Sequence, residues 1–81
     1  MISNTQLVAK LRELGFSLED QTKRVFIYRK KGTPIRVTFN KRDFHSELGA
    51  GNVLSQAKMD KTVVRAWIAG VEAQNKEQKK P

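Results

Sequence analysis

The sequence predicts an α+β fold: a two-layer α-β-β-β-α domain with an antiparallel three-stranded sheet and an extra C-terminal helix. Three observations support this fold class. The chain has 81 residues, which is enough for one core only. Apolar residues recur at helical spacing near both ends of the chain. The middle holds short β-branched and aromatic runs separated by turn residues, as is typical of antiparallel strands.

The N-terminal segment predicts a helix. Ser3 is a favoured N-cap residue, and Gln6 stands at the position that completes a capping box. Gly15 occupies the place of a left-handed residue that ends a helix. One face of the helix is apolar because its residues follow the helical repeat: Leu7, Val8, Leu11 and Leu14.

Three strands are expected next. Residues 16–18 alternate in polarity and predict a short first strand, followed by a polar turn over 19–22. Residues 24–29 form the strongest strand signal, an unbroken run of β-branched and aromatic side chains. A turn rich in glycine and proline leads to a strand at 35–39, which makes an antiparallel hairpin.

The C-terminal half predicts two helices. A loop over 40–51 precedes a short helix at 52–59, and Asp60 is a good N-cap for a final helix ending near residue 74. The polar segment 75–81 has no periodicity, so we expect a disordered basic tail after a single domain over 1–74. The apolar stripe of the final helix follows the same repeat: Val64, Trp67, Ile68 and Val71.

Positive charge is concentrated in one quarter of the chain. The formal net charge is +8, and eight basic residues without an acidic one lie between positions 23 and 42. The remaining basic and acidic residues cancel. A hairpin carrying this charge would attract a polyanion, so nucleic acid is the expected partner. The eight predicted nucleic-acid-binding residues are Lys23, Arg24, Arg29, Lys30, Lys31, Arg36, Lys41 and Arg42.

Composition excludes several classes of protein. The chain has no cysteine, so it is neither a disulfide scaffold nor a thiolate metal protein. Its first residues lack the charged and apolar regions of a secretory leader, and no apolar run approaches the length of a membrane span. We therefore expect a cytoplasmic protein without membrane association or cofactor.

Short motifs over residues 4–59 resemble the HicA family of small toxins. The resemblance implies a double-stranded-RNA-binding-like fold, mRNA cleavage by a histidine on the second strand, and neutralisation by a HicB partner. The motifs are Leu14-Gly15-Phe16, Gly32-Thr33-Pro34-Ile35-Arg36-Val37-Thr38 and Val53-Leu54-Ser55-Gln56-Ala57.

The chain departs from that family at the catalytic position. The family carries Gly-Ser-His-His at the entry to the second strand, where this chain has Lys23, Arg24, Val25 and Phe26. Valine and phenylalanine cannot transfer a proton, so the family's general acid/base is missing. The resemblance thus implies the fold and the basic surface without the ribonuclease activity.

The hairpin offers a candidate surface for stacked bases. If Val25 and Ile27 face the helices, Phe26 and Tyr28 lie on the opposite face among basic residues and provide aromatic platforms. The alternative is that the two aromatic rings face inward. The sequence alone leaves both orientations open.

His45 is the only histidine, and Asp43 and Glu47 would share its side in an extended segment. One imidazole without a second ligand cluster does not make a metal site, so we expect a solvated loop histidine and no catalytic or metal residue. A substitute catalytic role for His45 remains an alternative.

Residues 54–67 resemble a helix-turn-helix, with Lys61, Thr62 and Arg65 toward the DNA major groove. Simple packing of the Trp67 stripe on the sheet is the competing interpretation.

The sequence thus predicts a small, basic, non-catalytic protein that binds RNA or DNA through its hairpin. Three alternatives stay open: a helix-turn-helix DNA-binding regulator, an inhibitor or adaptor of an acidic protein, and a HicA-type nuclease with a displaced active site. A HicB-like antitoxin is then a further candidate partner.

Overall fold

The computed structural model describes residues 1–78, and the α+β class and the antiparallel three-stranded sheet are confirmed. The side chains are described as far as Lys76. The elements in chain order are β1 (Ile2–Ser3), α1 (Asn4–Glu13), β2 (Phe16–Gln21), β3 (Val25–Lys30), β4 (Arg36–Asn40), β5 (Phe44–His45), α2 (Glu47–Gln56) and α3 (Lys61–Gln78).

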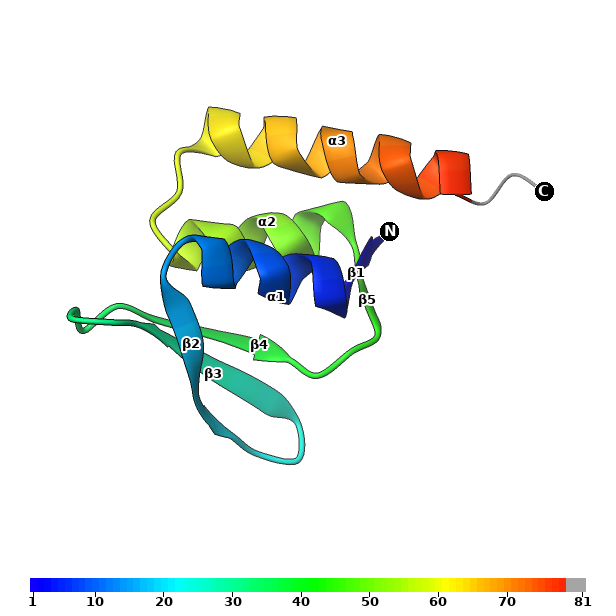
Figure 1. The fold of residues 1–81 in the computed structure, drawn as a ribbon. Helices are drawn as coiled ribbons and strands as arrows, with labels where there is room; N and C mark the ends of the chain where they lie inside the picture. The colour runs from blue at the N-terminus through cyan, green and yellow to red at the C-terminus, as the bar shows by residue number, and fades with distance from the viewer. Residues whose placement is uncertain (79–81) are drawn as a thin grey trace.

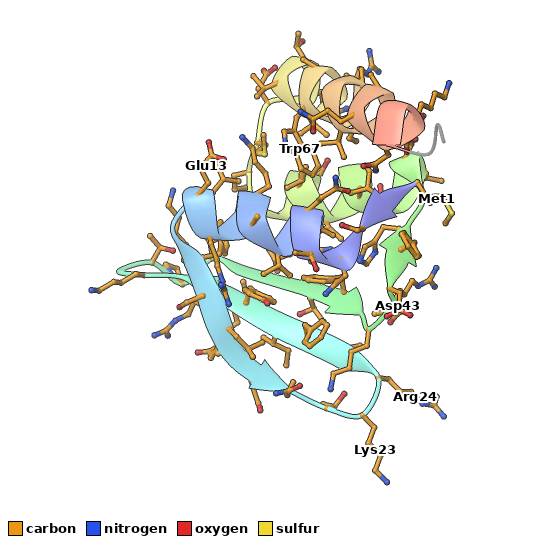
Figure 2. The ribbon with its side chains drawn as sticks, turned by 45° about the vertical axis from the view of Figure 1, so that its right-hand side comes forward. Met1, Glu13, Lys23, Arg24, Asp43 and Trp67 are labelled. Carbon is orange, nitrogen blue, oxygen red and sulfur yellow. The ribbon has the colours of Figure 1, made fainter. Side chains whose placement is uncertain are left out.

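The helices form two layers over one face of the sheet (Figure 1). The sheet has the order β2-β3-β4, and α1 and α2 pack against it through contacts with β2 and β4. The helix α3 lies on the far side of α1 and α2, where it contacts α2 and β1. The Trp67 stripe therefore packs toward α2 and β1, not on the three-stranded sheet. Figure 2 shows Trp67 pointing from α3 toward this helical layer.

The beginning and end of α1 follow the sequence prediction. The Ser3 hydroxyl accepts a hydrogen bond from the Gln6 backbone N–H at 3.1 Å, and the Gln6 side chain accepts one from the Ser3 N–H at 2.9 Å. Gly15 has a φ of +95°, which side chains other than glycine rarely adopt. Its carbonyl accepts a hydrogen bond from the Lys31 N–H, which fixes α1 to the far turn of the hairpin.

The aromatic residues of β3 face the helices, so the outward orientation is wrong. Phe26 pairs with Phe39 and Tyr28 with Val37, and these side chains share the inner face. Tyr28 is only 4% exposed. The larger rings take the buried face because they remove more apolar surface from water than valine or isoleucine does.

Three elements in the middle of the chain differ from the prediction. β2 continues to Gln21 because a bulge between Leu18 and Asp20 allows its polar end to keep pairing with β3. The expected loop contains β5, which pairs with β1, and α2 begins at Glu47 because Ser46 caps it.

The C-terminal helix is longer than expected. α3 passes through Gly70 and continues to Gln78, so residues 75–78 are helical and the prediction of a disordered tail there is wrong. Asn75 explains part of the extension, since its amide contacts the Gln6 side chain and the Met1 carbonyl. Residues 79–81 of the predicted tail lie outside the described residues. No helix within residues 1–78 has the length and apolar character needed to cross a bilayer.

The candidate nucleic-acid interface

Four cations gather at one end of the sheet, and we call Lys23, Arg24, Lys41 and Arg42 the end cluster. The Lys41 N–H donates to the Arg24 carbonyl at 2.8 Å, which joins the β2–β3 turn to the segment after β4. The Thr22 hydroxyl orders that turn by accepting from the N–H groups of Arg24 and Val25. Figure 2 shows Lys23 and Arg24 projecting from the turn into solvent.

The end cluster has little opposing charge. Among the side chains of residues 1–76, none of its four cations forms a salt bridge. Three of them are exposed, and Lys41 is half-buried with its ammonium 5.1 Å from the centre of the Phe26 ring. Asp43 follows Arg42 directly and is the nearby carboxylate in the sequence. Solvated cations in this number attract phosphate at low salt.

The two arginines at the centre of the outer face have a different environment, and we call Arg29 and Arg36 the arginine pair. They lie opposite each other on β3 and β4. Glu19 on β2 contacts both, at 3.5 Å from Arg29 Nε and 2.9 Å from Arg36 Nε. The sequence segment 23–42 contains no acidic residue, but the adjacent strand β2 supplies the Glu19 carboxylate. Half of the charge on this pair is therefore cancelled.

The last two predicted cations stand at the opposite end of the hairpin. Lys31 is exposed in the β3–β4 turn, and Lys30 is half-buried at the end of β3 beside Gly15. Gly32 closes the turn with a φ of +78°. The eight predicted binding residues thus divide into three separate groups along the sheet instead of forming one field.

The predicted base-stacking surface is not present on the outer face. Tyr28 is buried between Phe26 and Phe39, with ring centres 6.3 and 5.6 Å away. Phe26 is half-buried at the edge of the same cluster and lines a hollow with residues of the end cluster. Tyr28 is unavailable to a ligand, whereas Phe26 keeps one accessible side.

His45 lies in the protein interior, so the expectation of a solvated loop histidine is wrong. It is 4% exposed, its ring packs on Phe39, and its Nε2 is 3.0 Å from the Asn4 Oδ1. Burial lowers the pKa of His45, and the positive charge of Arg42 lowers it further. Neutral His45 therefore links β5 to the start of α1 as a structural group.

The residues of the predicted helix-turn-helix are exposed at the start of α3. The Asp60 carboxylate accepts from the Thr62 N–H at 2.8 Å, which confirms Asp60 as the residue that caps α3. Lys58 adopts the left-handed conformation, with a φ of 66°, in the turn between α2 and α3. Lys61 and Arg65 line a groove of about 630 Å³ between these two helices.

Among the side chains described, those of residues 1–76, no group of three or more histidine, aspartate or glutamate residues is placed to hold a metal ion. Asp43, His45 and Glu47, which share one side of an extended segment in the sequence prediction, do not meet. Phe44 and His45 are a two-residue strand, and Glu47 already belongs to α2.

The sequence alone does not reveal two residues that matter to the sheet. It predicts a turn at Glu19, although the position of Glu19 one strand away from two arginines decides how far their charge is neutralised. Gln56 stands out in the sequence only as part of a short motif. Its side-chain amide donates to the Thr38 carbonyl and accepts from the Thr38 N–H, both at 3.1 Å, and so covers part of the free edge of β4. A predicted strand that extended through Gln21 would have identified the first of these residues.

No family model, curated protein or solved structure matches this chain. The resemblance to HicA toxins stays a prediction that rests on its short motifs.

Proposed function

We propose that the chain is a small, basic, cytoplasmic protein that binds nucleic acid without cleaving it and docks through the end cluster. The observation that carries the proposal is the charge of this cluster. Four cations from two adjacent segments lie together, and no salt bridge neutralises them in the part of the chain that the structure describes. Phosphate contacts by such cations supply most of the affinity of sequence-independent binding.

The pairing of charges limits which cations of the hairpin are available to a phosphate. Arg29 and Arg36 already share Glu19, so they gain less from a phosphate than a solvated cation does. Lys30 and Lys31 are separated from the end cluster by the length of β3. We therefore assign the first contact to the end cluster and later contacts to the two lysines.

We propose that the chain does not cleave nucleic acid because His45, its candidate general acid/base, is inaccessible. His45 is buried and its Nε2 is engaged by Asn4, so it is poorly placed to reach a substrate hydroxyl. Val25 and Phe26 stand where the HicA resemblance implies the catalytic histidine. Neither side chain can exchange a proton.

A second candidate function is a helix-turn-helix DNA-binding regulator. It is favoured by the left-handed turn at Lys58 and by the exposure of Lys61, Thr62 and Arg65 at the start of α3. In this case Arg65→Ala would weaken binding more than substitution of the end cluster.

The test is a titration of the purified chain against duplex RNA, duplex DNA and single strands at about 50 and about 200 mM salt. Four phosphate contacts predict a log–log salt slope of about −3 to −4. The strands are examined for cleavage afterwards, and intact strands are expected. Absence of binding at low salt would reject the proposal and favour an acidic protein partner. Cleavage would favour a displaced nuclease site.

A further inference from the structure

Phe26 borders an open hollow beside the end cluster. The hollow has a volume of about 330 Å³, and its other lining residues are Asn4, Lys41, Arg42 and Asp43. This is near the lower limit of volumes found for small-ligand sites, which are about 300–1,000 Å³. Its walls combine an aromatic ring with cationic and polar side chains.

The Phe26 ring packs beside two other aromatic rings on the inner face of the sheet. The centre of the Phe39 ring lies 5.7 Å from the centre of the Phe26 ring, and the centre of the Tyr28 ring lies 6.3 Å from it. Both supporting rings are buried. Phe26 is therefore the outermost ring of a packed aromatic cluster, and a flat group that entered the hollow would meet a surface already fixed in place.

The Lys41 ammonium lies over the Phe26 ring, and both residues line the hollow. It lies 5.1 Å from the Phe26 centroid, at the distance of a cation–π contact. The lysine side chain is long and flexible, so a ligand could displace the ammonium from the ring toward a phosphate. The same residue would then contact the backbone of a nucleotide whose base lies on Phe26.

The rim of the hollow carries groups suited to the edge of a base. The Asn4 Oδ1 is engaged by His45, while its amide N–H₂ group can donate. Asp43 offers a carboxylate acceptor, and its backbone carbonyl is fixed by the Asn4 N–H at 2.8 Å. A donor and an acceptor beside an aromatic surface is the combination by which proteins hold unpaired bases.

We propose that this hollow binds one unpaired nucleobase, so that the ligand class is single-stranded nucleic acid, with Phe26 as the stacking residue. The inference rests on the proposed function, because the end cluster supplies the phosphate contacts around the base. Bases inside a duplex present no free face, so a duplex would use the end cluster alone.

The experiment compares ligands that differ only in their bases. A labelled strand of about 10 nucleotides, made both as RNA and as DNA, is titrated beside an abasic strand of the same length and the corresponding duplex. We expect the native chain to bind the normal strand about tenfold more tightly than the abasic strand. The RNA and DNA arms show which sugar is preferred.

The matched variants test the ring itself. Phe26→Leu keeps an apolar side chain and removes the flat surface, so it should reduce binding of the normal strand to the level of the abasic strand. Phe26→Trp should retain the preference. Phe44 is the control, since it is 56% exposed and does not line the hollow. Phe44→Leu should bind as the native chain does. Circular dichroism verifies the fold of each variant.

Two results would overturn the inference while the proposed function survives. One is equal, salt-dependent binding of the native chain to normal and abasic strands, which is measurable even if Phe26→Leu does not fold. The other is an equal loss on Phe44→Leu and Phe26→Leu, which would indicate a general apolar contact. Absence of binding to every strand would instead reject the proposed function.

Discussion

The centre and the end of the three-stranded sheet carry the same types of side chain in different electrostatic environments. At the centre, Arg29 and Arg36 share one carboxylate from the neighbouring strand. At the end, the four cations of the end cluster form no salt bridge within the described residues. Both groups belong to one segment that the sequence shows as uniformly basic. Cross-strand pairing, and not charge along the chain, therefore decides which of these cations are free for a ligand.

The largest effect is expected from removing the end cluster. Substitution of all four cations by glutamine should lower affinity for a nucleic acid by about a hundredfold at about 50 mM salt, because about four phosphate contacts disappear. The salt slope should flatten accordingly. Fluorescence anisotropy at several salt concentrations measures both quantities.

The matched control neutralises the arginine pair. The double variant Arg29→Gln with Arg36→Gln removes two cations of the same segment, yet it should change affinity by only about twofold, since Glu19 already opposes them. An equal loss in both variants would mean that total charge alone governs binding.

A more discriminating change acts on the opposing carboxylate. Glu19→Gln should free both arginines, tighten binding by about threefold to tenfold and make the salt slope steeper by up to about two. The free energy of unfolding should fall by less than about 1 kcal/mol, because these side chains are substantially exposed. Unchanged binding in Glu19→Gln would show that the arginine pair lies outside the interface. Urea unfolding gives the stability term.

The opposite end of the hairpin should contribute less to the binding affinity than the end cluster does, and only for long ligands. β3 has six residues, so Lys30 and Lys31 lie about 20 Å from the end cluster. Lys30→Gln with Lys31→Gln should weaken binding of a strand that spans this distance by about threefold and leave a strand of about four nucleotides unaffected. An equal loss for both lengths would place the lysines in the primary contact.

The smallest effect is the dependence of stability on pH, which we expect from His45 in β5 and its contact with Asn4. Burial, with a further contribution from Arg42, holds the pKa of His45 below its ordinary value of 6.5. The unfolded chain therefore takes up the proton first on acidification. Stability should be complete above pH 6.5, fall as the pH drops through that value, and stop falling below the folded pKa.

Thermal unfolding of the native chain and of His45→Gln between about pH 7.5 and 5 measures this contribution. The Tm of the native chain should decline as the pH falls over this range. The variant should lack the part of the decline that comes from protonation of His45. Parallel profiles for the two chains would show that the histidine does not couple stability to pH.

Local signals in the sequence account for much of the fold. Ser3 with Gln6 fixes the start of α1 and Gly15 its end, because capping and a positive φ depend on neighbouring residues only. Asp60 similarly fixes the start of α3. These features require no knowledge of distant partners.

The features that the sequence left open depend on distant partners. Val25-Phe26-Ile27-Tyr28 is apolar on both faces, so alternation cannot say which side is buried. The pairing with Val37 and Phe39 decides it. β5 consists of two residues and exists only because β1 lies beside it, and this pairing places His45 in the interior. For the same reason, Glu19 acquires its role only when β2, β3 and β4 are aligned.

The position of α3 has a consequence for partial unfolding of the molecule. α3 buries Val64, Ile68 and Val71 against the helical layer and lies on the far side of that layer from the three-stranded sheet (Figure 1). Detachment of α3 need not disturb a hydrogen bond between strands, so it can proceed as a separate partial unfolding. Native-state hydrogen exchange should therefore find the amides of α3 exchanging with a lower opening free energy than those of β3, and nucleic acid should slow exchange at the end cluster without protecting α3.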